Sequence, residues 1–165
     1  MRLLLSSTPV SLLSPISPTM NGADWSTPYP LIMQDAARIK GSAILDAEAV
    51  WLDANGVADF EALHSRSNDT RTTALAFDLL MLGEEDMRRK SYVERKAALR
   101  KLLRGDRGIQ YVEHAEGHGD KLFEAVCKLG LEGIVLKKLD SPYRSGPSKA
   151  WIKFKNPRAS SNSGA

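Results

Sequence analysis

A stretch near the C-terminal end, residues 132–155, constrains the fold of this chain more than any other part of it. Two short segments in the stretch are strand-like. Ile134–Leu136 is an apolar run, and Trp151–Lys155 alternates between apolar and basic residues. A period of two is typical of a β-strand, so Lys153 and Lys155 are expected on one face and their apolar neighbours on the other.

This pattern has a functional and a purely structural interpretation. The ammonium groups of Lys153 and Lys155 would lie about 7 Å apart, which suits a polyphosphate because its charge needs more than one cation. Glu132 precedes the first strand-like segment and is suited to hold the divalent metal that accompanies a nucleotide. The alternative is a pair of amphipathic strands with solvated lysines, and periodicity by itself favours that alternative.

Composition limits the classes of protein to which the chain can belong. With 165 residues, of which 42% are hydrophobic, it is long enough for one domain with its own core. Basic residues gather in 88–107 and 137–158, as expected for a nucleotide or nucleic-acid partner and equally for a solvated helix face. The single cysteine, Cys127, excludes a disulfide framework. We expect a cytoplasmic protein without a membrane span, because no apolar stretch approaches about 18 residues.

The two ends of the chain have a different composition from the rest. Residues 1–20 contain five serines, three prolines and no acidic residue, and they are expected to be disordered. Their apolar start, Leu3–Leu5, is too short and too interrupted for a signal peptide. Residues 158–165 form a polar tail, which is also expected to be disordered.

Between the ends, strand and helix patterns alternate. Periodicity predicts helices near 31–39 and at Tyr92–Leu103 and Asp120–Lys128, and strands at Ala43–Leu52, Thr72–Leu82 and Ile109–Val112. In the second helix, the residues expected to face the core are Val93, Ala97, Leu99 and Leu103, and those expected to face solvent include Arg95 and Lys96.

The strand expected at Ala43–Leu52 carries two carboxylates at positions of equal parity. Asp46 and Glu48 would lie on the same face. Two buried carboxylates are unfavourable unless a cation lies nearby, so a cation site is one interpretation. A strand with one ordinary polar face is the other, and the two stay open at this point.

Several of these segments, in this order, resemble the motifs of ATP-dependent DNA ligases of the bacterial end-joining type. The matching positions are Asn21–Trp25; Leu45, Asp46, Glu48 and Val50 of motif III; Phe77–Leu80 of motif IIIa; Glu132, Gly133, Val135 and Lys137 of motif IV; and Ser141, Tyr143, Gly146, Trp151, Lys153 and Lys155 around motif V. Ala47 departs from the pattern, because the family has glycine there. The resemblance covers 21–157, and the preceding segment resembles nothing in the family.

The resemblance implies a fold, a ligand and a set of site residues. The fold would be α+β: a partial nucleotidyltransferase (ATP-grasp-like) adenylation domain, with antiparallel strands lining a nucleotide cleft and helices outside. The cofactors would be ATP with Mg²⁺ or Mn²⁺, and the partner a nicked or broken DNA duplex. The implied roles are metal or ribose contacts for Glu48, metal binding for Glu132, adenine stacking for Phe77, and phosphate binding for Lys137, Lys153 and Lys155.

Two parts of such an enzyme have no counterpart in this sequence. The family's nucleophile is the lysine of a Lys-x-Asp-Gly motif, which becomes adenylylated, and no segment here spells that motif. Lys40 is no substitute, because Gly41-Ser42 follows it and it occupies the wrong place in the motif order. The C-terminal OB-fold that closes over the site is also missing. No catalytic residue is therefore assigned.

Three hypotheses follow. The chain is a ligase-like segment for DNA nick sealing in repair and recombination, inactive alone and in need of a polypeptide that supplies the missing motifs. Alternatively, it is a non-catalytic module that binds nucleotide or DNA. The third hypothesis is a remnant without selected activity. A shifted reading frame, a rearrangement or a misplaced start would each explain the change in composition before Asn21.

Overall fold

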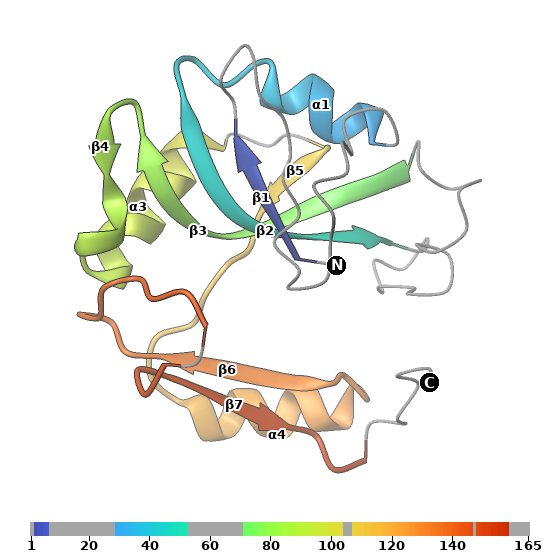
Figure 1. Cartoon of the computed structure of the whole chain (residues 1–165). Coiled ribbons are helices and arrows are strands. Elements are labelled where there is room, and N and C mark those ends of the chain that lie inside the picture. Colours follow the sequence, from blue (N-terminus) through green and yellow to red (C-terminus); the bar gives the residue numbers. More distant parts are fainter. Residues whose placement is uncertain (1, 7–28, 53–70, 104–106, 147, 159–165) are drawn as a thin grey trace.

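The computed structural model describes residues 2–6, 29–52, 71–103, 107–146 and 148–158. Figure 1 shows these residues in two parts, a larger one built on five strands and a smaller one built on two. In chain order the elements are β1 (Arg2–Ser6), α1 (Pro30–Ala36), β2 (Ala43–Trp51), β3 (Thr72–Leu82), β4 (Glu85–Asp86), η2 (Met87–Arg89), α3 (Tyr92–Leu102), β5 (Ile109–Tyr111), α4 (Gly119–Lys128), β6 (Gly133–Lys137) and β7 (Trp151–Lys155).

The first sheet has the order β1-β2-β3-β4, all antiparallel, and β5 pairs with β3 in parallel. Small apolar residues recur at alternate positions of β2 and β3, which lets α1 and α3 pack closely on the sheet. The core side chains come from these two strands, from both helices and from β5, and they include Leu45, Ala47, Ala49, Ala74, Ala76, Leu79, Ile32, Leu99 and Ile109. The core therefore lies between this sheet and its two helices.

The pairing of β2 with β3 is interrupted twice. Asp46 pairs with Asp78, but the next residue of β2 pairs with Ala76, so Phe77 is an extra residue in β3. A similar shift leaves Leu80 without a partner position. Such bulges bend a strand and change the direction in which its side chains point.

The second sheet is the antiparallel pair β6–β7, covered by α4. The alternation predicted for β7 is confirmed by the register, in which Lys153 lies opposite Val135 and Phe154 opposite Ile134. Phe154 contacts Phe123 of α4, with ring centroids 6.1 Å apart. The apolar face of the pair is therefore directed toward the helix, and the lysines are on the other face.

The α+β class and most predicted elements are confirmed, with β2, β3 and α4 within one residue of the expected bounds. Three features differ or lie outside the described residues. The strand β5 is parallel to its neighbour rather than antiparallel. The sequence predicts disorder for residues 2–6, but they form a strand whose backbone pairs with β2. The remainder of 1–20, the segment 21–25 and residues 159–165 lie outside the described residues.

The predicted faces of the helix α3 are partly wrong: Leu99 and Leu103 are buried as expected, but four other residues of the helix are not placed as predicted. Arg95 and Lys96 are buried, at 0% and 2% exposure, whereas Val93 is 40% exposed. The reason is that each buried cation has a specific partner, which offsets the cost of removing its charge from water. A hydrophobic pattern does not register such partners.

No helix in the described part of the chain is long and apolar enough to cross a membrane.

Candidate functional site

Two of the predicted site residues lie on the first sheet. Glu48 is half-buried on β2, opposite Leu75 of β3. It shares a strand face with Asp46, as alternation predicts, and Asp46 itself is buried. Phe77 is half-buried at the bulge in β3. The bulge thus places one predicted residue beside the strand that carries the other.

The other four predicted residues belong to the second sheet or its border. Glu132 directly precedes β6, and its side chain forms an ion pair with Lys153 at 3.1 Å. Both side chains are exposed, so the pair is accessible from solvent. Lys155 lies opposite Gly133 in the same register and is also exposed. One of the two predicted metal ligands, Glu132, therefore lies beside the exposed lysine face of β7.

Lys137 has a different environment from the two lysines of β7. Its ammonium group lies 4.2 Å from the ring centroid of Trp151 and 4.9 Å from that of Tyr92. Cation–π contacts of this kind fix the position of the ammonium group without neutralising it. Lys137 is thus held at the border between β6 and the start of α3.

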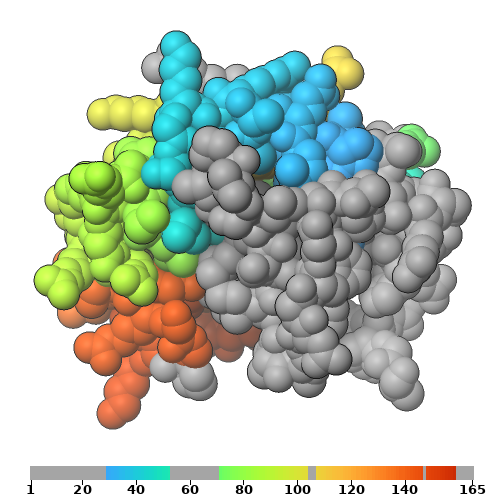
Figure 2. Space-filling model, turned by 45° about the horizontal axis from the view of Figure 1, so that its top comes forward, coloured from blue at the N-terminus to red at the C-terminus, as the bar shows by residue number. Residues whose placement is uncertain are grey.

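The loop 138–146 lies between β6 and β7 in the chain, and it contains none of the predicted site residues. Its backbone contacts the region of η2 and α3 twice: Val93 N donates to Leu139 O at 3.2 Å, and Tyr143 N donates to Arg88 O at 2.8 Å. In the space-filling view of Figure 2, the orange segment that contains this loop lies directly against green residues of the larger part of the molecule. The two parts of the molecule therefore meet at this loop.

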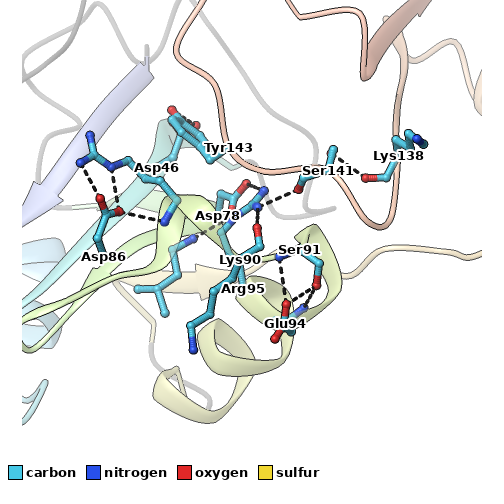
Figure 3. Close-up of polar contacts among 12 residues, drawn as sticks. Asp46, Asp78, Asp86, Lys90, Ser91, Glu94, Arg95, Lys138, Ser141 and Tyr143 are labelled. Atoms are coloured by element: carbon cyan, nitrogen blue, oxygen red, sulfur yellow. Dashed lines mark hydrogen bonds and ion pairs between the residues drawn. The ribbon is translucent and has the colours of Figure 1, made fainter.

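Side chains strengthen this contact (Figure 3). The Tyr143 hydroxyl donates to the buried carboxylate of Asp46 at 3.1 Å. The Arg95 guanidinium binds both carboxylate oxygens of Asp78, at 2.7 and 2.9 Å, and also donates to Ser141 O at 2.9 Å. Two motif residues, Asp46 and Asp78, are thus occupied by structural contacts rather than directed toward a ligand.

Sequence reasoning missed Arg95 and Lys96, although one signal points to the first of them. Asp78 interrupts an otherwise apolar strand, and a buried carboxylate requires a cation. Lys96 donates to Val112 O at 2.6 Å and lies 3.9 Å from the ring centroid of Tyr111. Burial, and secondarily the charge of Lys137, lowers the pKa of Lys96 to about 8. A second cation therefore lies near the border between the two parts.

No preformed metal cage exists among the residues that the structure describes, since no group of three or more His, Cys, Asp or Glu side chains is close enough to hold an ion. Glu48 lies on β2, and Glu132 borders the second sheet. Protein sites usually bind Mg²⁺ through one or two carboxylates together with substrate phosphates, so both side chains are of the ligand type that Mg²⁺ uses. A shallow depression of about 480 Å³ is lined by residues of β4 and α3, including Glu85 and Lys101, and none of the predicted site residues borders it.

Comparison with known proteins gives a consistent result. Residues 21–155 match the family model described as "ATP dependent DNA ligase domain". The chain is 36% identical over 136 residues to the multifunctional non-homologous end joining protein LigD of Mycolicibacterium smegmatis, covering 81% of this chain and 18% of that protein. For the protein of the same name from Pseudomonas aeruginosa, the identity is 36% over 143 residues, covering 83% and 17%. The chain thus spans less than a fifth of these curated relatives.

Solved structures show the same relationship. The chain superimposes on the ligase domain of M. tuberculosis LigD with a TM-score of 0.78 at 32% identity, covering 93% of this chain and 50% of that one. A mycobacterial DNA ligase D complexed with ATP and MES gives a TM-score of 0.75, also at 32% identity, with the same coverage of both chains.

Proposed function

The chain belongs to the ATP-dependent DNA ligase domain family, and we propose that its described residues form part of an ATP site of an adenylation domain. The observation that carries the proposal is the hydrogen bond from Tyr143 to Asp46. It joins the loop before β7, which carries Lys153 and Lys155, to the strand β2, which carries Glu48. The residues that match the family's nucleotide motifs thus belong to one connected unit.

The proposed roles are those that the family resemblance implies, and the local environment of each side chain is compatible with its role. Phe77, half-buried at a bulge, offers a ring to the adenine, and Glu48 accepts hydrogen bonds from the ribose or contacts the metal. Lys153 and Lys155 bind the phosphates from an exposed strand face. Glu132, now paired with Lys153, would hold the metal that accompanies the nucleotide. Lys137, whose ammonium group lies against the Trp151 ring, offers the phosphates a third positive charge.

The metal is proposed to arrive with the nucleotide. Glu48 and Glu132 would offer it carboxylate oxygens, the donor type that such ions prefer. Mg²⁺ and Mn²⁺ both suit such oxygen donors. When bound, the ion would neutralise phosphate charge, and this chain's own residues would orient the nucleotide between the two sheets.

The covalent step of ligation is not assigned to these residues. None of the 165 residues belongs to a Lys-x-Asp-Gly sequence, so no nucleophile is identified here. We propose that this chain holds ATP and contacts nicked or broken DNA, and that the nucleophile comes from a polypeptide segment outside the printed sequence. The proposed layout is a non-family segment at 1–20, the partial adenylation domain at 21–157 and a tail at 158–165.

A second candidate function is non-catalytic binding of DNA. The observation that favours it is that β7 presents two exposed lysines, Lys153 and Lys155, on one strand face. In this case DNA affinity would fall steeply with salt, because phosphate contacts release counterions, and no adenylylation would accompany binding.

The test of the proposed site is the shift in melting temperature that ATP with Mg²⁺ produces. The wild-type chain should be stabilised by ATP, because a ligand that binds only the folded state raises its melting temperature. The double variant Lys153→Ala/Lys155→Ala should lose this shift. A matched control is Lys121→Ala/Lys128→Ala, which removes the same charge from exposed positions on α4 and should keep it. An unchanged shift in the β7 variant would refute the phosphate assignment.

A further inference from the structure

Arg95 makes more contacts between separate segments than its place on an amphipathic helix suggests. Its side chain is completely buried, and its Nε and Nη2 atoms bind the two carboxylate oxygens of Asp78 on β3. Its Nη1 atom donates to Lys90 O at 2.6 Å and to Ser141 O at 2.9 Å. One guanidinium group thus contacts β3, the segment before α3, and the loop between β6 and β7 (Figure 3).

The loop that Arg95 contacts leads directly to the proposed phosphate residues. Lys137 ends β6 just before the loop, and Trp151 begins β7 shortly after it. The carbonyl oxygen of Ser141 accepts from Arg95, and the Ser141 hydroxyl donates to Lys138 O at 2.6 Å, at the start of the same loop. A displacement of Ser141 would therefore be transmitted to both strands of the second sheet.

The other end of the same contact borders the proposed adenine residue. Asp78 follows Phe77 directly in β3, and its Oδ1 atom also accepts from the backbone N–H of Leu79 at 2.9 Å. The carboxylate thus fixes the backbone just after the bulge. Arg95 thereby connects the segment that positions the adenine ring to the loop that positions the phosphate-binding lysines.

We propose that Arg95 is a positioning residue, which sets the distance between the adenine-binding segment of β3 and the phosphate-binding face of β6–β7. This inference rests on the proposed function. It assigns no contact between Arg95 and the ligand, because the guanidinium is enclosed by protein.

The geometry requires arginine rather than any cation. A guanidinium is planar and has five N–H donors in a fixed arrangement, so it can bind a carboxylate with two atoms and carbonyl oxygens with a third. The rings of Tyr92 and Tyr143 lie 5.7 and 5.9 Å from its central carbon and restrict its orientation. A lysine could retain the charge opposite Asp78, but its single ammonium group could not maintain all these contacts at once.

The test compares the affinities of adenosine and ATP. Adenosine contacts only the proposed base and ribose residues, whereas ATP also uses the lysines of the second sheet. Calorimetry with the whole chain would give both dissociation constants, in Mg²⁺, for the wild type and for Arg95→Lys. The matched control is Arg88→Met, which removes an exposed arginine that also binds an aspartate, Asp86, with two atoms.

In the wild type, ATP should bind more tightly than adenosine. In Arg95→Lys this preference for ATP should fall at least tenfold, while adenosine affinity changes less than threefold; Arg88→Met should keep the wild-type ratio. If Arg95 only stabilised the fold, Arg95→Lys would lower the affinities for ATP and for adenosine by the same factor. An ATP-to-adenosine ratio in Arg95→Lys equal to that of the wild type would overturn the inference and leave the proposed function intact. A wild-type chain that binds neither ligand would overturn both.

A second variant keeps the test decisive if Arg95→Lys fails to fold. In Asp78→Leu/Arg95→Met, apolar side chains replace the whole buried pair, a change that proteins often tolerate without loss of stability. This variant should show the same selective loss of preference for ATP. Amide hydrogen exchange should also accelerate at Tyr143, whose N–H is bound to Arg88 O, relative to the amides of β2. Unchanged exchange at Tyr143 together with an unchanged ratio would overturn the inference.

Discussion

Asp78 with Arg95 and Asp86 with Arg88 are two pairs of the same residue types in different environments. Both side chains of the first pair are completely buried, so the desolvation of each charge must be offset by the other charge, by the carbonyl oxygens around the guanidinium and by the Leu79 N–H that donates to Asp78. Asp86 and Arg88 form a similar two-atom contact, but both are substantially exposed. Hydrogen bonds from Arg88 lower the pKa of Asp86 to about 2, yet water screens that pair.

The first prediction concerns these two pairs. Asp78→Asn should reduce the free energy of unfolding by about 3 to 5 kcal/mol, because it leaves the buried Arg95 charge without its partner. Asp86→Asn should have a much smaller effect, since both members of its pair can be hydrated. Urea unfolding of the two variants beside the wild type measures the difference. Equal losses of unfolding free energy in the two variants would show that the buried pair contributes no more to stability than the exposed one.

At the scale of elements, β6–β7 depends on a glycine at its first position. Gly133 has φ +154°, and a Cβ there would clash with the carbonyl oxygen of Phe154 on the facing strand. Because the clash is with backbone, a flexible side chain cannot relieve it. The glycine that follows Glu132 is therefore required by the pairing of these two strands.

The second prediction tests this requirement. Gly133→Ala should destabilise the chain by about 3 kcal/mol and increase hydrogen exchange throughout β7. Gly146→Ala is the matched control: Gly146 has φ +84°, but open space surrounds the position of its Cβ. The control should lose only about 1 kcal/mol, from its left-handed backbone, and leave β7 protected. Full protection of β7 in Gly133→Ala would show that the strand pair can adjust.

The end of α3 that lies nearest the second sheet is also defined by its sequence. Ser91 accepts from the N–H of Glu94, and the Glu94 carboxylate accepts from the N–H of Ser91, which together form a capping box. These bonds to Ser91 lower the pKa of Glu94. The cap fixes where α3 begins, and consequently where Arg95 and Lys96 are placed on it.

At the scale of the whole molecule, charge gathers at the border between the two parts. Burial lowers the pKa of Lys96 to about 8, from an ordinary value of 10.5, and raises that of Tyr92 to about 12. Below pH 8 the folded state contains Lys96 as a buried, protonated ammonium group, and its desolvation opposes folding. Between pH 8 and 10.5 the folded lysine is neutral while the unfolded one is still protonated, so the unfolded state binds more protons and stability rises with pH.

The third prediction follows from this expected rise of stability with pH. The difference in unfolding free energy between wild type and Lys96→Met should change by about 1 kcal/mol from about pH 7 to about pH 9, with the wild type gaining relative to the variant. Comparing the two proteins at each pH cancels the contributions of groups that both contain. Lys101→Met, at an exposed position on the same helix, should show no such change. Parallel curves for Lys96→Met and wild type would refute the prediction.

The sequence by itself determined the local elements and the family. Period-two alternation predicted the faces of β7 correctly, and the apolar run of β3 predicted its bounds, because strand periodicity depends only on the residues of the strand. The order of motifs from residue 45 to residue 155 was sufficient to indicate a ligase-type domain, which the family match confirms. The roles of Glu48, Phe77, Glu132, Lys137, Lys153 and Lys155 stay predictions.

Only the tertiary structure decided which charges are buried. Arg95 and Lys96 look solvent-facing on a helical wheel, but Asp78 and Val112, which lie on other segments of the chain, provide their partners. Likewise, the parallel pairing of β5 and the bond from Tyr143 to Asp46 depend on how remote segments pack. Periodicity reports an average preference for water, whereas the burial of a charge depends on one partner at one distance, and that is fixed only when the chain folds.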